Sequence, residues 1–184
     1  RASHWFPVLV KNDELYFRAY PSAPLGDLSP QNWLRVPLQY GGLRDAVVAG
    51  RVLITVEAHG REIALYEIRG WKPGERRQVV PGPRRKLADI LPGAAPSIEC
   101  MTLVEGSTSW VVFIVETAGE RVLFAGSPSD IKPSEWKTQV IEIQPNKITT
   151  QVLACAGSRD SHYLSLKDQG IRKINIVQQR TEGM

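Results

Sequence analysis

Residues 27–33 read DLSPQNW and residues 130–136 read DIKPSEW, and this repeated segment decides the fold prediction. Both copies hold an Asp, a branched aliphatic residue, one variable residue, a Pro, two variable residues and a Trp. Each follows a strand-like run with a Pro-Ser or Ser-Pro-Ser turn, and each precedes alternating apolar residues. Trp33 and Trp136 are 103 residues apart. Agreement over about 30 positions indicates an internal repeat.

Four candidate β-hairpins form a second repeated series. Each joins two runs of alternating apolar residues through a short polar connection with Gly or Asn-Asp, which is a strong signal for a tight turn between antiparallel strands. The candidates span residues 8–17, 53–66, 113–124 and 164–176. Their turns are 47, 59 and 51 residues apart, so the 103-residue Trp spacing corresponds to two units.

Runs of small residues precede the last three hairpins. They lie at residues 44–50, 98–106 and 153–160. Aligning them brings Ala46, Cys100 and Cys155 into register. Each unit should then contain four strands: the small-residue strand, the two hairpin strands, and a fourth such as residues 77–80 or 138–143. The first unit lacks its opening strand and the last unit lacks its closing strand.

Repeats of about 40–50 residues with four strands each are typical of β-propeller blades. We therefore predict an all-β fold, a β-propeller of about four blades of four antiparallel strands. The chain should form one domain, residues 1–184, with units at about 1–42, 43–92, 93–147 and 148–184. A β-sandwich, or part of a larger propeller, is the alternative. Residues 86–91 alone favour a helix, of a turn or two, and residues 70–97 are expected to be a long irregular connection.

The two Asp-to-Trp segments resemble the Asp-box of sialidase-like propellers, in which Ser/Thr-x-Asp-x-Gly-x-x-Trp caps the turn between two outer strands. Here the Asp-to-Trp separation is six residues rather than five, and Pro replaces the turn glycine. The Asp-box is structural in the families that carry it. The resemblance therefore implies that Asp27, Trp33, Asp130 and Trp136 support the fold and do not contact a ligand.

The composition is that of an ordinary globular protein, with 42% hydrophobic and 23% charged residues. A formal charge of +4 favours weak attraction to anions but is too small to indicate a nucleic-acid-binding domain. The three histidines and two cysteines have no metal-ligand spacing, so neither a metal nor a cofactor is expected. Cys100 and Cys155 fall in the innermost strands, where we expect buried free thiols, although adjacent strands could bring them together. No apolar run reaches the roughly 18 residues of a membrane helix.

The most basic stretch is residues 69–86, RGWKPGERRQVVPGPRRK, whose only acidic residue is Glu75. A basic loop with an aromatic residue can bind phosphates, sulfated sugars or single-stranded nucleic acid, or can contact a partner protein. The opposing interpretation is a solvated connection between two blades. The candidate ligand- or partner-binding residues are Arg69, Trp71, Lys72, Arg76, Arg77, Arg84 and Arg85.

The sequence favours a non-enzymatic binding domain that presents blade loops to a protein partner. Trp33 and Trp136 recur only in alternate units, which favours one partner surface over a carbohydrate-binding, lectin-like propeller with several equal pockets. A sialidase-like glycoside hydrolase fragment is the third hypothesis. It would need converging arginines, a tyrosine nucleophile and an acid–base aspartate, and no spacing ties together the candidates Arg18, Arg35, Arg44, Arg51, Tyr16, Tyr40 and Asp45.

A protein is the expected partner, with a glycan or another anionic ligand as the alternative. The unclosed terminal strands could also pair two copies of the chain into a homodimer. The sequence does not indicate a compartment.

Overall fold

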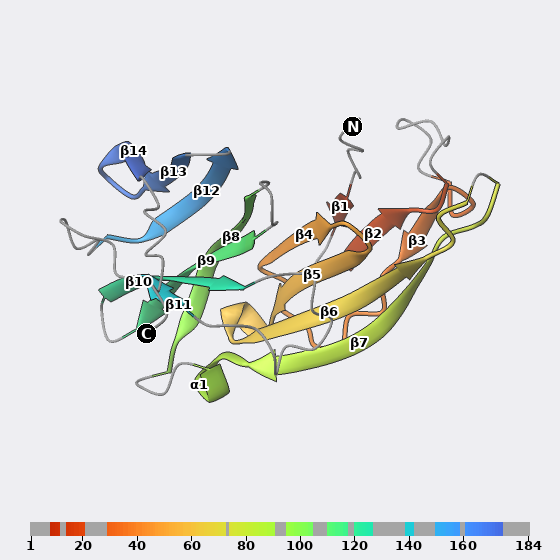
Figure 1. Cartoon of the computed structure of the whole chain (residues 1–184), viewed down its shortest axis with the longest axis horizontal. Helices are drawn as coiled ribbons and strands as arrows, with labels where there is room; N and C mark the ends of the chain where they lie inside the picture. The colour runs from red at the N-terminus through yellow and green to blue at the C-terminus, as the bar shows by residue number, and fades with distance from the viewer. Residues whose placement is uncertain are drawn as a thin grey trace, which may run out of the picture.

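The computed structural model describes residues 8–11, 14–20, 29–72, 74–90, 95–104, 110–117, 120–126, 139–141, 150–158 and 161–174, and these form almost only antiparallel strands (Figure 1). The all-β prediction is confirmed. The first sheet contains β1 (Val8–Lys11), β2 (Glu14–Arg18) and β3 (Trp33–Arg35). The second contains β4 (Asp45–Ala49), β5 (Val52–Glu57), β6 (Glu62–Arg69) and β7 (Gln78–Lys86).

The third sheet contains β8 (Ser97–Val104), β9 (Trp110–Thr117), β10 (Glu120–Gly126) and β11 (Gln139–Ile141). The fourth contains β12 (Val152–Ser158), β13 (Ser161–Leu166) and β14 (Gly170–Ile174). A one-turn helix, α1 (Leu87–Ile90), and a 3-10 turn, η1 (Ala58–Gly60), complete the described elements.

Every sheet is an antiparallel meander in which neighbours in the chain are neighbours in the sheet. The four hairpins expected from the turn residues are present as β1–β2, β5–β6, β9–β10 and β13–β14. Among the described strands, the second and third sheets have four and the first and fourth have three. In the described part of the chain, the positions without a strand are the opening one of the first sheet and the closing one of the fourth.

The β5–β6 hairpin shows how local sequence ties two sheets together. Its turn places His59 and Gly60 at φ values of 56° and 95°, a region that glycine enters without strain. A Cβ atom at Gly60 would lie 2.6 Å from the carbonyl oxygen of Ile98 on β8, so only glycine lets the third sheet approach this closely. His59 itself is an exposed turn residue.

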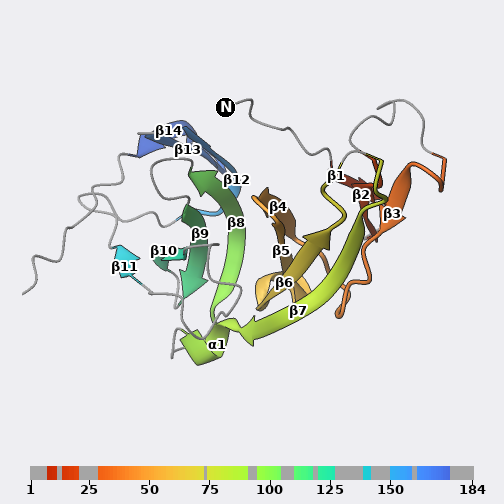
Figure 2. The same cartoon turned by 45° about the vertical axis from the view of Figure 1, so that its right-hand side comes forward.

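The second sheet lies between the first and third sheets (Figure 2). All six residues of β5 are buried, because neighbouring sheets cover both of its faces. Leu53 packs with Leu15 and Phe17 of the first sheet, in a cluster we call the first–second core. Ile54 belongs to the second–third core, which also contains Phe113. Burying apolar surface stabilises a fold by about 25 cal/mol per Å², so both cores contribute to the stability of the chain.

The opening strands of the last three sheets, β4, β8 and β12, contact one another in chain order. The described residues do not identify a closed ring of sheets, so the propeller remains a prediction. Within the part of the chain that the structure describes, no helix combines the length and hydropathy needed to cross a membrane.

Two expectations are wrong. Residues 78–86 are not part of an irregular connection but form β7, which continues the expected strand at 77–80 through Pro81 and Pro83. An outer strand tolerates proline because its outward side needs no N–H donor. Secondly, Cys100 and Cys155 are not free thiols: they form a disulfide between β8 and β12, with Cα atoms 6.1 Å apart.

Candidate functional site

The basic segment of residues 69–86 divides between a buried part and an exposed part. Arg77 is only 4% exposed, and its guanidinium lies 5.5 Å from the ring centroid of Phe17 and 5.1 Å from that of Trp71. Its backbone N–H donates to Ala19, and its side chain donates to the Arg18 carbonyl at 3.4 Å. Burial, with a smaller effect of the Arg18 charge, lowers the pKa of the Arg77 guanidinium. Arg77 therefore joins the first and second sheets.

Trp71 also has a structural role, although its sequence context suggested exposure. The indole Nε1–H donates to the Ile68 carbonyl at 2.6 Å, and the half-buried ring packs against the first–second core. Gly70 makes this turn possible, since it has a φ of 78° and a Cβ atom there would lie 2.4 Å from the Arg76 carbonyl oxygen.

The remaining candidate residues lie at or near the surface of the second sheet. Arg69 forms an exposed ion pair with Glu67 at 2.7 Å, which also lowers the pKa of that carboxyl. Arg85 is half-buried. Four exposed cations remain along β7 and the connection before it, and we call them the basic strip: Lys72, Arg76, Arg84 and Lys86.

Arg84 is the member of the basic strip whose side chain is held in place. Its guanidinium lies 4.5 Å above the ring centroid of Tyr40 and donates a hydrogen bond to the Tyr40 hydroxyl. Cation–π stacking of an exposed arginine contributes about 0.5–1 kcal/mol. The larger effect is geometric, because stacking restricts a side chain that otherwise has many rotamers.

Tyr40 is itself anchored by a buried carboxylate. Glu57 is 0% exposed, and its Oε2 accepts the backbone N–H of Tyr40 at 2.9 Å. Its Oε1 accepts hydrogen bonds from the Thr55 hydroxyl at 2.6 Å and the Tyr66 hydroxyl at 2.7 Å. Burial, reinforced by the carboxylate of Glu57, raises the pKa of Tyr66 far above its ordinary value, so this hydroxyl stays protonated as a donor. A series of contacts thus runs from the core to Arg84.

A groove lies beside Tyr40 on the connection between the first and second sheets. It has a volume of about 480 Å³, and its lining residues are Glu14, Arg35, Val36, Pro37, Leu38, Gln39, Tyr40 and Gly41. Its walls combine apolar side chains with the Glu14–Arg35 ion pair, whose closest atoms are 2.5 Å apart. Tyr40 therefore lines the groove and at the same time positions the Arg84 side chain.

The contacts of the residues proposed for a sialidase-like centre do not bring them together around one substrate position. Tyr16 donates to Glu14 at 2.5 Å, and this hydrogen bond raises the pKa of the Tyr16 hydroxyl, which opposes its use as a nucleophile. Arg35 pairs with the same Glu14. Arg44 instead donates from Nε to the Glu99 carbonyl on the third sheet at 3.4 Å. No common substrate position follows from these contacts.

Of the four Asp and Trp residues that define the two Asp-to-Trp segments, the structure describes Trp33, which is 8% exposed. Burial agrees with a role in the fold. Asp27, Asp130 and Trp136 lie outside the described residues.

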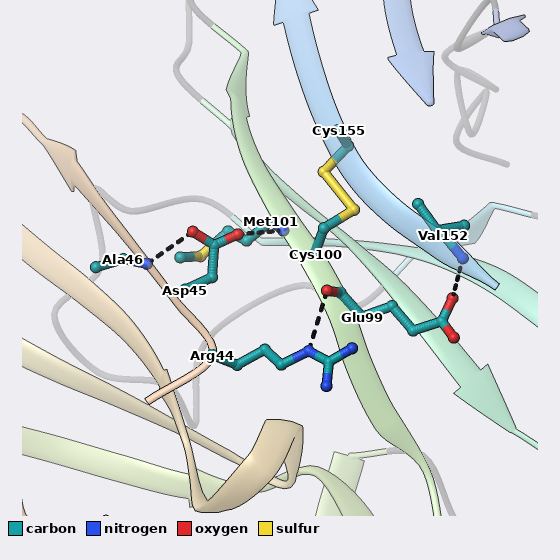
Figure 3. The surroundings of a disulfide bond; sticks show 8 residues. All are labelled: Arg44, Asp45, Ala46, Glu99, Cys100, Met101, Val152 and Cys155. Carbon is teal, nitrogen blue, oxygen red and sulfur yellow. Dashed lines mark hydrogen bonds between the residues drawn. A yellow bond between two sulfur atoms is a disulfide. The ribbon is translucent and has the colours of Figure 1, made fainter. Parts of the chain in front are cut away.

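The opening strands carry cross-links that sequence reasoning missed (Figure 3). Asp45 on β4 accepts the backbone N–H of Met101 on β8 at 2.9 Å, and Glu99 on β8 accepts that of Val152 on β12 at 2.9 Å. The two acceptors occupy equivalent positions of the repeat, because Asp45 and Glu99 each precede by one residue the aligned positions Ala46 and Cys100. The two donors do not, since Met101 follows Cys100 by one residue and Val152 precedes Cys155 by three. The disulfide adds a covalent link between β8 and β12.

The sequence signals for these roles differ in strength. The repeat alignment could have shown in advance that Asp45 and Glu99 occupy equivalent positions in their units. Glu57 had no such signal, because an acidic residue at the end of a strand usually faces solvent. Comparison of the chain with models of known protein families and with curated proteins gives no match.

Proposed function

We propose that this chain is a non-catalytic, propeller-type interaction domain. In this proposal the basic strip and the adjoining groove bind acidic side chains of a protein partner. The observation that carries the proposal is the placement of Arg84. An exposed guanidinium is held over Tyr40, Tyr40 is held by buried Glu57, and the groove opens beside them. A pre-organised arginine loses little entropy on binding, which is the property of a recognition residue.

The propeller arrangement is part of this proposal. Four meander sheets follow one another in the chain, and the opening strands of three of them contact each other. Propeller blades are arranged in this way, with the first strand of each blade nearest the axis. On this arrangement β7 is an outer strand, and its side chains are accessible to a folded partner.

Strand β7 favours recognition by side chains over recognition by backbone. Pro81 and Pro83 have no N–H group, so this edge offers a partner strand an interrupted row of donors. Arg84 and Lys86 are two residues apart and therefore point to the same side of the strand. The partner should accordingly present carboxylates at matching positions.

The test compares two exposed arginines of the same sheet. Wild-type protein, Arg84→Ala and the matched control Arg51→Ala are used as bait in native lysate, and each is also applied to a glycan array with sulfated and neutral sugars. We expect one protein to be recovered by wild type and Arg51→Ala and to be lost, by about tenfold or more, with Arg84→Ala. Arg84→Lys should recover an intermediate amount, because lysine keeps the charge without the planar stack.

Equal recovery by Arg84→Ala and wild type would remove the basic strip from the proposal. Strong binding to a defined sugar that depends on Arg84 would replace it with a lectin. Arg77 is unsuitable for this test because its buried side chain joins two sheets.

A further inference from the structure

The fourth sheet carries all the exposed large apolar side chains among the described residues. Leu153 is 57% exposed, Tyr163 42% and Ile171 77%. Isolated exposed apolar residues are ordinary, but a group on one small sheet marks an interaction surface.

The two faces of this sheet differ. Val152, Leu164 and Leu166 are buried on the side where β12 meets β8. The strand register defines the opposite face by two cross-strand rows, Ala154–Ser165–Ile171 and Ala156–Tyr163–Lys173. The irregularity between Val152 and Ala154 adds Leu153 beside this face. The open face is therefore apolar at its centre and basic at the β14 side.

Among the residues that the structure describes, no strand pairs with the outer edge of β14. The described strands of the fourth sheet number three, whereas the second and third sheets have four. The position next to β14 corresponds to that of β7 and β11 in those sheets. Ile171, Arg172 and Lys173 are all exposed, and β14 contains no proline, so its outward backbone groups can pair with another strand.

The charges of β14 determine which kind of strand can pair with its edge. Arg172 and Lys173 are adjacent at the middle of β14. Antiparallel pairing with β14 of a second copy would set Arg172 opposite Arg172 or Lys173, and like charges directly opposite each other destabilise a sheet. Because adjacent strand residues point to opposite faces, Arg172 and Lys173 lie on the two faces of the sheet. A strand with two adjacent acidic residues would place one carboxylate opposite each cation.

We propose that the outer edge of β14 binds an extended, acidic segment of a partner protein as an added fourth strand of this sheet. Main-chain hydrogen bonds along β14 supply affinity, and carboxylates opposite Arg172 and Lys173 supply selectivity. This site is separate from the basic strip and does not depend on it.

The test uses a fluorescein-labelled valine–glutamate peptide of about eight residues, with two adjacent glutamates between valines, the length of a typical strand. Binding to the full chain is followed by fluorescence anisotropy. The same peptide with alternate backbone nitrogens methylated keeps every side chain but cannot pair as a strand. We expect wild type to bind the first peptide at least about tenfold more tightly than the methylated one. Arg172→Glu/Lys173→Glu should weaken binding by a similar factor, while Arg84→Glu/Lys86→Glu on β7 should bind like wild type.

Three results would overturn the inference: no binding of the valine–glutamate peptide to wild type, equal binding of both peptides, or loss of binding through the β7 substitutions. The last would indicate that the peptide binds the basic strip, which would support the proposed function and remove this site. A dimer of the wild-type chain in light scattering, dissociated by Ile171→Asp, would show that a second copy occupies the edge and would also overturn the inference. Circular dichroism of each variant establishes that it remains folded.

Discussion

The second and fourth sheets are meanders of the same kind with opposite surroundings. The second sheet is covered on both faces, and all six residues of β5 are buried. The fourth sheet is covered on one face and exposes Leu153, Tyr163 and Ile171 on the other. Apolar burial stabilises the second sheet. In the fourth sheet, a disulfide and the hydrogen bond from the Val152 N–H to Glu99 add to a smaller apolar burial. Neighbouring sheets, rather than strand sequence, therefore decide whether a repeat becomes core or surface.

Their outer edges differ in a related way. Pro81 and Pro83 interrupt the edge of β7, whereas β14 has a continuous backbone edge that carries Arg172 and Lys173. The first edge suits side-chain contacts and the second suits strand addition.

The largest expected effect comes from removing the cross-link of the fourth sheet. Cys100 and Cys155 are 55 residues apart in sequence, and closing a loop of that length stabilises a fold by about 4 kcal/mol in the chain-entropy treatment. We expect Cys100→Ala/Cys155→Ala to lose roughly that much in urea unfolding. Amide exchange should accelerate in β12–β14 before it does so in β5 and β6. Reductant should destabilise wild type and leave the variant unchanged, and equal stability of the two proteins would show that the disulfide does not hold this sheet.

Next in size is the difference between two aliphatic side chains. Leu65 is 0% exposed in the second–third core, so Leu65→Ala should cost about 3 kcal/mol by leaving a cavity. Ile171→Ala, on the open face, should change the free energy of unfolding by less than about 0.5 kcal/mol. Chemical denaturation of both variants measures the contrast. Similar costs would mean that the open face of the fourth sheet is covered.

A smaller effect is expected from deleting one buried hydroxyl. Tyr66→Phe removes a donor to Glu57 and leaves a buried carboxylate with one partner fewer, which should cost about 1.5 kcal/mol. Tyr163→Phe on the fourth sheet serves as the control, since its ring is 42% exposed. Thermal unfolding measures both. Equal thermal stability of the Tyr66→Phe and Tyr163→Phe variants would show that the hydrogen bond from Tyr66 to Glu57 does not stabilise the second sheet.

The smallest effect concerns pH and the link from the second to the third sheet. Burial raises the pKa of Asp45 in the folded chain, while hydrogen bonds from Met101 and Ala46 oppose this in part. The folded state therefore holds a proton at a pH where the unfolded state has lost it. The contribution of Asp45 to stability should fall as the pH rises from the ordinary carboxyl value through the raised one. Asp45→Asn removes this dependence, so the stability of wild type minus that of the variant should decrease over this window, and a constant difference would contradict the assignment.

Sequence alone predicted the elements that depend on local chemistry. Turn residues and apolar alternation located all four hairpins, because a tight turn and a two-residue period are properties of neighbouring residues. The extent of β7 was missed, since Pro81 and Pro83 usually interrupt strands and are tolerated only on an outer edge.

The candidate site was harder to predict because it depends on contacts between sheets. Arg77 and Trp71 read as surface residues, yet they pack between the first and second sheets. The repeat spacing placed Cys100 and Cys155 in register, but whether they bond depends on the distance between β8 and β12, which the spacing does not give. Glu57 acts through Tyr40, 17 residues earlier in the chain.

The disulfide also bears on where this protein reaches its native form. Glutathione and thioredoxin keep thiols reduced in the cytosol, whereas secretory compartments and the bacterial periplasm oxidise them. In a reducing compartment, the fourth sheet would be attached to β8 by packing and by the hydrogen bond to Glu99, without the disulfide. The edge of β14 would then be less firmly positioned. Oxidising conditions therefore favour the form in which this edge is ready for a partner, and the choice of expression host should decide how homogeneous the purified protein is.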